Sequence, residues 1–305
     1  NSSSYSCIYN VMIGYQTGYS LQSGDYNTAV GYRAGRNLVD HTNNTFMGYN
    51  SGYNNSGNNN VAMGYNSGNH VSGGDNVNIG NHAGYHGGSG SHNVSIGSHA
   101  GYGASQSTRH GNTFVGYNAG RNCYTGGYNT YIGYNAGYHT YNGAEHNVAI
   151  GYQSGYHVYD AGKYNVYIGD RAGYCSKNSI NCIAIGRGAG YHMGKQSYSP
   201  HSYNATNNHI IMGYNAGYCM YSGSNNILIG RECGEYLYSG GDNVCMGYRA
   251  GRGNSNFTDC TFIGSHAGNN VTGNYNTCIG RHSGYAISSY SQNTCVGYQS
   301  GSHAH

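Results

Sequence analysis

The side chains with the greatest chemical potential in this sequence are histidines and cysteines. The chain holds 17 His and 10 Cys. Four of the histidines form two pairs at equivalent places in the sequence, His82 with His99 and His266 with His282. Imidazole is a common metal ligand, and two adjacent imidazolium groups repel each other at low pH. Two histidines without a carboxylate make an incomplete site, so we expect no metal and no cofactor.

No arrangement of residues predicts an enzyme. The sequence lacks a GxSxG elbow, an HExxH helix and a P-loop, and its 10 acidic residues are scattered. The glycine-rich run 186–190 belongs to a repeat that recurs along the chain, so it is no evidence for nucleotide binding. The cysteines show no CxxC spacing of the kind that holds zinc. We therefore expect a non-enzymatic protein.

The composition restricts the partners and the compartment. Charged residues make up 8% of the chain and no basic run is present, which argues against a nucleic-acid partner. No long apolar run predicts a membrane span. Asn-x-Ser/Thr sequons permit glycosylation, and ten cysteines suit an oxidising setting if they are paired or buried. These features favour an extracellular location or a cell or virion surface.

The elements that position these residues are the copies of one short repeat. A stretch typified by Asn147–Gly155 recurs seventeen times, and we number its positions from the central glycine as zero. Successive central glycines follow one another at a nearly constant interval, with one longer gap between Gly186 and Gly213. They are Gly14, Gly31, Gly48, Gly64, Gly80, Gly97, Gly116, Gly133, Gly151, Gly169, Gly186, Gly213, Gly230, Gly247, Gly264, Gly280 and Gly297.

The period and composition together predict an all-β fold. Gly occurs 54 times, and in a helix each would cost about 1 kcal/mol relative to Ala. Short strands joined by tight turns fit the repeat, and successive coils can stack as parallel strands. We therefore predict a parallel β-solenoid, a β-roll or β-helix, of about 17 coils with a ~17-residue repeat. It forms a single domain over 1–305, with an inserted loop extruded at about 192–206.

Two adjacent positions of the repeat predict which side chains face the lumen of the coil and which face outward. Position −1 is Ile, Val or Met in every copy, so we assign it to the lumen. The predicted lumen core is Ile13, Val30, Met47, Ile79, Ile150, Ile185, Ile229 and Ile279. Position −2 should then point outward, yet it is apolar in most copies, which suggests that a neighbouring chain covers it. The predicted lateral interface is Phe46, Phe114, Ile211, Leu228 and Phe262.

Position −4 predicts a ladder of hydrogen-bonded amides. It is Asn in fourteen copies, including Asn27, Asn44, Asn60, Asn129 and Asn147. Stacked in register, these side chains can hydrogen-bond to one another along the axis, or each can satisfy only the backbone of its own turn.

Tyr fills positions +1 and +5 in ten copies each, and we expect stacked, partly exposed rings there.

Register also predicts one thiol pair. Cys278 and Cys295 both occupy position −2 in successive coils, which brings their Cα atoms within disulfide range. We expect them to be adjacent, and bonded if the protein is secreted. Cys175 and Cys182 form a weaker candidate pair.

The repeats resemble those in the heads of YadA-like trimeric autotransporter adhesins and in related phage and viral tail-fibre proteins. The stretches Asn27–Gly35 and Asn147–Gly155 carry this resemblance, through Val-x-Ile-Gly and Ala/Ser-Gly elements. The adhesin repeat is shorter than the one in this chain, and it is poorer in Tyr and Cys. The resemblance implies a left-handed β-roll and packing of three chains. It covers no stalk or membrane anchor.

Three functions fit these observations. The first is an extracellular structural fibre or filament subunit, a homo-oligomer or trimer that assembles with itself through end-to-end and lateral contacts. Uncapped first and last repeats are the reason to expect end-to-end growth. The second is an adhesin or fibre head that binds a surface or a glycan through its tyrosines. The third is ice binding, which needs a continuous outward Thr array, whereas Thr at position −3 alternates here with Val and Ile.

Overall fold

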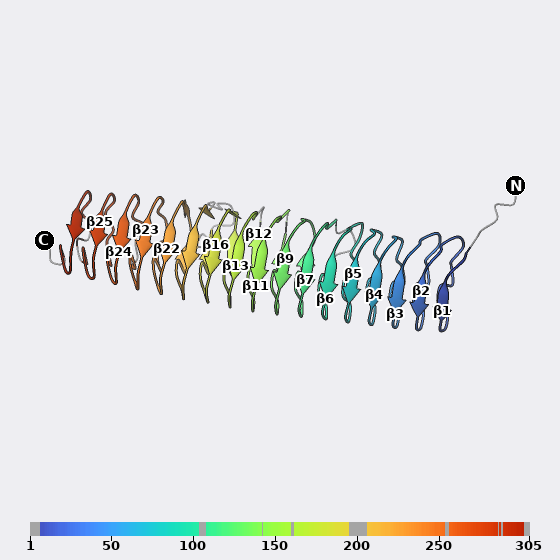
Figure 1. Cartoon of the computed structure of the whole chain (residues 1–305). Helices are drawn as coiled ribbons and strands as arrows, with labels where there is room; N and C mark the ends of the chain where they lie inside the picture. Colours follow the sequence, from blue (N-terminus) through green and yellow to red (C-terminus); the bar gives the residue numbers. More distant parts are fainter. Residues whose placement is uncertain are drawn as a thin grey trace. The chain divides into compact units, whose positions relative to one another are not determined.

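The computed structural model describes residues 7–103, 108–141, 143–159, 162–194, 206–253, 256–285, 287 and 289–301. Within these ranges every regular element is a β-strand, and inside each of two units the main strands pair in parallel with the equivalent strands of the next repeat, so the fold is the predicted β-solenoid. The chain divides into two compact units, Asn1–Glu145 and His146–His305. Both units are built from the same coil, whose main strand runs through positions −3 to −1 (Figure 1).

Parallel pairing in the first unit keeps equivalent residues of successive coils side by side. Thr28 pairs with Thr45, and Ala29 with Phe46. Short strands with a turn on each side leave room for one such segment per coil. The main strands are β1 (Val11–Ile13), β2 (Thr28–Val30), β3 (Thr45–Met47), β4 (Val61–Met63), β5 (Val77–Ile79), β6 (Val94–Ile96), β7 (Thr113–Val115) and β9 (Thr130–Ile132).

The second unit repeats this pattern through the insertion in its sequence. Ile183 pairs with Ile210 across this longer interval, so the stack keeps its register. Most of the predicted extruded loop, residues 195–205, lies outside the described residues. The main strands are β11 (Val148–Ile150), β13 (Val166–Ile168), β16 (Ile183–Ile185), β19 (Ile210–Met212), β22 (Ile227–Ile229), β23 (Val244–Met246), β24 (Thr261–Ile263), β25 (Thr277–Ile279) and β26 (Thr294–Val296).

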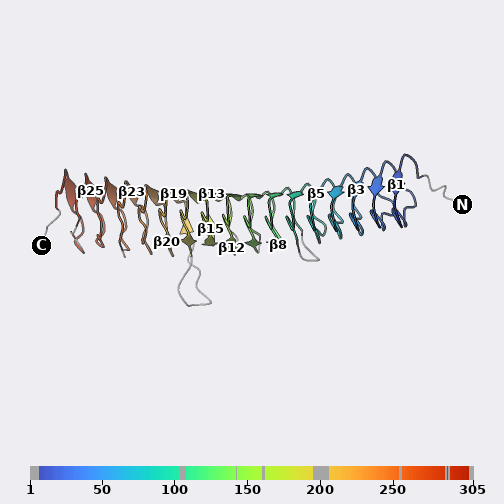
Figure 2. The same ribbon diagram turned by 90° about the horizontal axis from the view of Figure 1, so that it is seen from below.

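Shorter strands complete the coils on the side opposite the main strands (Figure 2). In the first unit, β8 (Asn122–Cys123) pairs with β10 (His139–Thr140). In the second unit, β12 (His157–Tyr159), β14 (Cys175–Lys177), β17 (His192–Met193) and β20 (Cys219–Met220) form one parallel ladder. A third ladder joins β15 (Ser179–Ile180), β18 (Thr206–Asn207) and β21 (Gly223–Ser224).

The central glycine is required by the stacking itself. Gly116 has φ +130°, and a Cβ there would lie 2.5 Å from the carbonyl oxygen of Gly133 in the next coil. The glycine at position +4 ends the following corner with φ +57°, as in Gly101 and Gly137. A side chain at the central position would force the backbones of two coils apart. The recurring glycines therefore set the coil-to-coil spacing.

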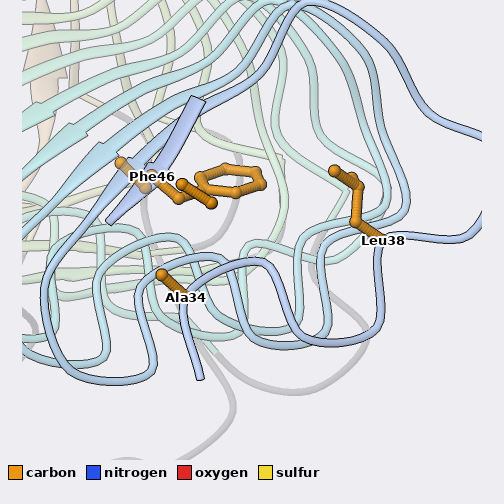
Figure 3. Close-up of a cluster of buried hydrophobic side chains, with 5 residues drawn as sticks. Ala34, Leu38 and Phe46 are labelled. Atoms are coloured by element: carbon orange, nitrogen blue, oxygen red, sulfur yellow. The ribbon is translucent and has the colours of Figure 1, made fainter. Parts of the chain in front are cut away.

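The core fills the lumen of each coil. Phe46 is fully buried and contacts a cluster that includes Ala34 and Leu38 (Figure 3). In the strands on either side of Phe46, the paired residues are Ala29 and Ala62. A large ring between two small side chains lets successive coils share one lumen at native packing density. Burying such a ring stabilises the fold by roughly 1.5–3 kcal/mol.

Candidate functional site

The main strands carry an exposed apolar surface, which we call the outer strand face and define as positions −3 and −1 of all coils. Met47 and Met246, both at position −1, are each 40% exposed. Position −3 holds only Val, Ile or Thr, and Ile210 in that column is 37% exposed. Neither column contains a charged residue in any copy. The face is therefore a continuous strip of aliphatic and threonine side chains within each unit.

This arrangement reverses the two columns assigned from the sequence. The predicted lumen residues Ile13, Val30, Met47, Ile79, Ile150, Ile185, Ile229 and Ile279 lie on the outer strand face, and each is at least partly exposed. The predicted lateral-interface residues Phe46, Phe114, Ile211, Leu228 and Phe262 are all buried and line the lumen. Both assignments were wrong in orientation. Position −2 is covered by its own coil.

Side-chain volume explains why position −2, and not position −1, faces the lumen. Position −2 varies from Ala62 to Phe46 and Tyr167, all buried, and the large ring of Phe46 lies between Ala29 and Ala62 of the neighbouring coils. Tyr167 is fully buried, and its hydroxyl lies 2.5 Å from the Ser176 hydroxyl. Uniform size at position −1 reflects instead the regular surface of the strands. Variation of an apolar column is thus compatible with burial when large and small residues alternate along the stack.

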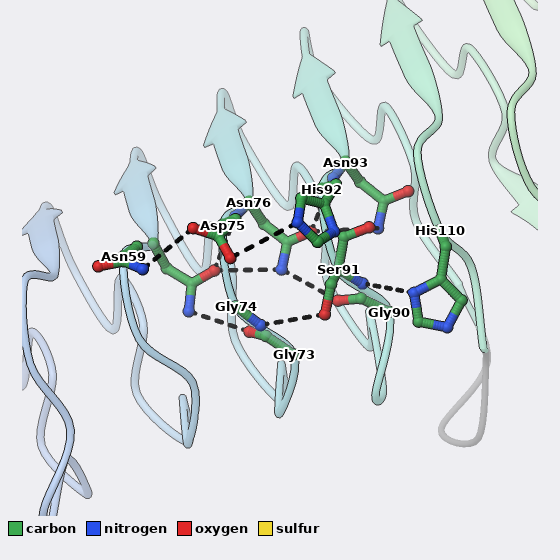
Figure 4. Close-up of polar contacts among 11 residues, drawn as sticks. Asn59, Gly73, Gly74, Asp75, Asn76, Gly90, Ser91, His92, Asn93 and His110 are labelled. Carbon is green, nitrogen blue, oxygen red and sulfur yellow. Dashed lines mark hydrogen bonds and ion pairs between the residues drawn. The ribbon is translucent and has the colours of Figure 1, made fainter.

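The predicted asparagine ladder is present and lies inside the coil. Asn76 donates from its backbone N and from Nδ2 to Oδ1 of Asn60, at 3.0 and 3.1 Å. Its Nδ2 also donates to the Gly90 carbonyl at 3.0 Å, and Asn93 continues the ladder in the next coil (Figure 4). The same bonds join Asn27 to Asn44, Asn112 to Asn129 and Asn147 to Asn165. These buried amides satisfy one another, which buried polar groups require.

The tyrosine columns stack as expected and border the outer strand face. The rings of Tyr15, Tyr32, Tyr49 and Tyr65 form a continuous stack with centroids 4.9–5.3 Å apart. Tyr49 is 44% exposed, so one edge of the stack faces solvent. Such a column adds flat amphipathic rings beside the aliphatic strip and contributes beyond its area of burial.

The two histidine pairs stack ring on ring. The centroids of His82 and His99 are 5.2 Å apart, and those of His266 and His282 are 4.8 Å apart. Burial lowers the pKa of His82, and burial followed by Arg121 and His82 lowers that of His99. Both rings are therefore mainly neutral at pH 7. Among the described side chains, no group of three or more His, Cys, Asp or Glu is gathered to hold a metal ion.

The cysteines lie mostly in the lumen as free thiols. Cys278 and Cys295 are partners in register, which confirms the predicted adjacency, but both are free in this structure. Burial and then the neighbouring Cys295 raise the pKa of Cys278 to about 12, so its thiol is protonated at neutral pH. Cys175 pairs in register with His192, while Cys182 takes the place of an asparagine in the ladder. Cys175 and Cys182 form no disulfide with each other.

Sequence reasoning missed a notch in the second unit, which we call the Gly188 notch. Position +2 is polar in all the other coils, and its side chains often bond between coils, as Arg171 does with Gln153 at 3.1 Å. Gly188 leaves this rung empty beside a cavity of about 180 Å³. The cavity is lined by Asp170, Arg171, Arg187, Tyr191, Tyr214 and Asn215, among others. The signal that could have found it is the coincidence of Gly at +2 with charged residues at +1 in two coils.

The charges in the Gly188 notch leave it with a net positive charge. Arg187 Nε lies 3.6 Å from one carboxylate oxygen of Asp170, and its guanidinium lies over the Tyr214 ring at 5.7 Å. The other oxygen, Oδ1, makes no hydrogen bond and lies 3.9 Å from Nε of Arg171. A lining of aromatic rings with a few hydrogen-bond donors and acceptors is typical of a site for a small ligand.

Comparison with known protein families and with curated proteins gave no match for this chain. Across the described residues, no helix of the length and apolarity needed to cross a bilayer is present.

Proposed function

We propose that this chain is an extracellular structural subunit of a fibre or filament, and that it associates laterally with copies of itself through the outer strand face. The observation that carries this proposal is the exposed apolar strip of each unit, in which Met47 of the first unit and Met246 of the second are each 40% exposed. Monomeric proteins rarely expose contiguous apolar patches above a few hundred Å². In the first unit the two columns run over eight main strands, β1 to β7 and β9, and a standard interface buries roughly 800 Å² per partner.

A second copy of the chain is the occupant that fits this face best. The face lacks charge, so a charged or nucleic-acid partner would gain little from it. Its pattern repeats from coil to coil, and only another regular array of strands presents a surface with the same spacing. The tyrosine stack along its border supplies amphipathic rings, which are enriched at interfaces. The expected end-to-end contact and trimeric state stay predictions.

Charge placed on the outer strand face tests the proposal. Replacing Met47 and Ile132 together by Lys puts two charges on exposed positions of the face. A matched control places two Lys at Gln22 and Ser72, which are exposed and belong to other positions of the coil. Sedimentation velocity should show association for the unmodified chain and the control, and dissociation for the face variant, with unchanged circular dichroism. An unchanged oligomer in the face variant would remove the outer strand face as the interface.

The Gly188 notch favours a second function, that of an adhesin. It provides arginine donors, the Asp170 carboxylate and tyrosine walls around a cavity of about 180 Å³. Sugar rings bind to aromatic faces and hydrogen-bond through their hydroxyls, which suits this lining. Gly188→Asn should fill the notch, because Asn118 and Asn135 already form successive hydrogen-bonded rungs of the same column at 3.0 Å. Binding on a glycan array that survives this substitution would exclude the notch as the site.

A further inference from the structure

A buried arginine lies in the lumen of the first unit. Arg109 is 4% exposed, and its Nε and Nη1 atoms have no hydrogen-bond partner. The guanidinium carbon lies 5.9 Å from the centre of the Phe114 ring. A guanidinium keeps its proton in proteins even when burial lowers its pKa, as it does here. The lumen therefore contains a positive charge whose donors are not satisfied.

The polar surroundings of Arg109 are specific to this part of the chain. Position −2 is apolar in every copy except at Asn78 and Ser95, which pair with each other in adjacent strands. Both line the same small cavity as Arg109. The volume of this cavity is about 10 Å³, which is room for one water-sized particle. Arg109, Asn78 and Ser95 thus converge on one internal space, which the ladder residues Asn76 and Asn93 also line.

No group among the described residues neutralises the charge of the Arg109 guanidinium. The described part of the chain places no carboxylate within ion-pair distance of Arg109. The ionisable neighbour that most affects Arg109 is Cys123, and burial raises the pKa of its thiol more than Arg109 and Thr140 lower it. A neutral thiol leaves the charge uncompensated. Leaving a charge buried and unpaired is among the most destabilising arrangements in a protein interior.

We propose that this cavity is a binding site for a single small anion, with chloride as the occupant. The guanidinium supplies the charge and two donor nitrogens without a hydrogen-bond partner, while the Asn78 amide and the Ser95 hydroxyl line the same cavity and can also donate. The cavity is too small for sulfate, phosphate or a carboxylate. An internal chloride would allow the first unit to fold around Arg109, which goes beyond the proposed role of the outer strand face.

Anion exchange at constant ionic strength tests this site in the full chain. Urea unfolding is followed by circular dichroism while sodium chloride replaces sodium gluconate, whose anion does not fit the cavity. Above its dissociation constant, each tenfold rise in chloride should raise the folding equilibrium constant of the first unit tenfold. Line broadening of the 35Cl resonance by the protein, reversed by bromide, reports the same binding without unfolding.

Two variants distinguish a bound chloride from a water molecule in the same cavity. Arg109→Met should abolish the dependence on chloride and the 35Cl broadening. The double substitution Asn78→Ala and Ser95→Ala keeps Arg109, matches Ala62 at the same position, and should weaken chloride binding at least tenfold. This second variant decides the matter if the first does not fold. Equal stability of the unmodified chain in chloride and gluconate, with no 35Cl broadening, would overturn the proposal and leave a water molecule in the cavity.

Discussion

His209 interrupts the asparagine ladder of the second unit and should make that unit sensitive to acid. It occupies position −4, is fully buried, and accepts a hydrogen bond through Nδ1 from the backbone N of Asn226 at 3.2 Å. Its Nε2 has no hydrogen-bond partner, and the nearby Gly223 carbonyl offsets the effect of burial only in part. Burial lowers the pKa of His209 to about 4.

The sign and size of the effect follow from this shift. The pKa of the unfolded chain is near 6.5, so the unfolded state binds the proton more tightly and acid favours unfolding. Stability from neutral His209 is complete above pH 6.5 and is lost as the pH falls towards 4. One pKa unit corresponds to about 1.4 kcal/mol, so the shift from 6.5 to about 4 is worth about 3 kcal/mol in total. Between pH 7.5 and pH 5.0 the loss is about 2 kcal/mol.

His209→Asn should remove this loss. An asparagine restores the residue found at this position in fourteen other coils, and in most of them Nδ2 donates to a backbone carbonyl of the next coil, as Asn226 does to Gly240 at 2.8 Å. Urea unfolding at pH 7.5 and pH 5.0 measures the stability of the variant against the unmodified chain. The stability of the variant should fall by about 2 kcal/mol less between these two values.

A control isolates the buried site from the other histidines. His110→Asn makes the same replacement at an exposed histidine of the first unit, and it is measured beside the unmodified chain at both pH values. The comparison cancels contributions shared by all three proteins, including those of the stacked pairs. If His209→Asn shows the same loss at pH 5.0 as the unmodified chain, His209 is not held neutral by the ladder and the reasoning fails.

Three further predictions test the lumen and the stacking. Phe262→Ala should destabilise the second unit by about 3–5 kcal/mol in urea unfolding, because the ring is fully buried. A loss below about 1 kcal/mol would show that position −2 is not buried in the lumen. Gly116→Ala should lower the melting temperature sharply, because its Cβ would lie 2.5 Å from the carbonyl oxygen of Gly133, and an unchanged value would show that the coils can separate there. Mild oxidation should link Cys278 to Cys295 in preference to any other pair, and mass spectrometry that finds each linked elsewhere would contradict their register.

The sequence alone determined the class of fold and the register. Central glycines that recur at a short and nearly constant interval leave no length for a two-helix repeat and require backbones to approach closely, so parallel coils follow. Register then follows from the repeat, which is why the ladder through Asn27 and Asn44 and the adjacency of Cys278 and Cys295 could be predicted. The burial of the ladder is consistent with the burial of position −2, because positions −4 and −2 point to the same side of the strand.

Only the tertiary structure decided which apolar column faces inward. Alternation makes positions −1 and −2 opposite but does not say which is inside, and both are apolar. The decision depends on volumes summed across coils, such as Phe46 between Ala29 and Ala62, which no single repeat reveals. The Gly188 notch and the cavity at Arg109 are likewise defined by residues of several coils. Their existence depends on which side chains the stack brings together.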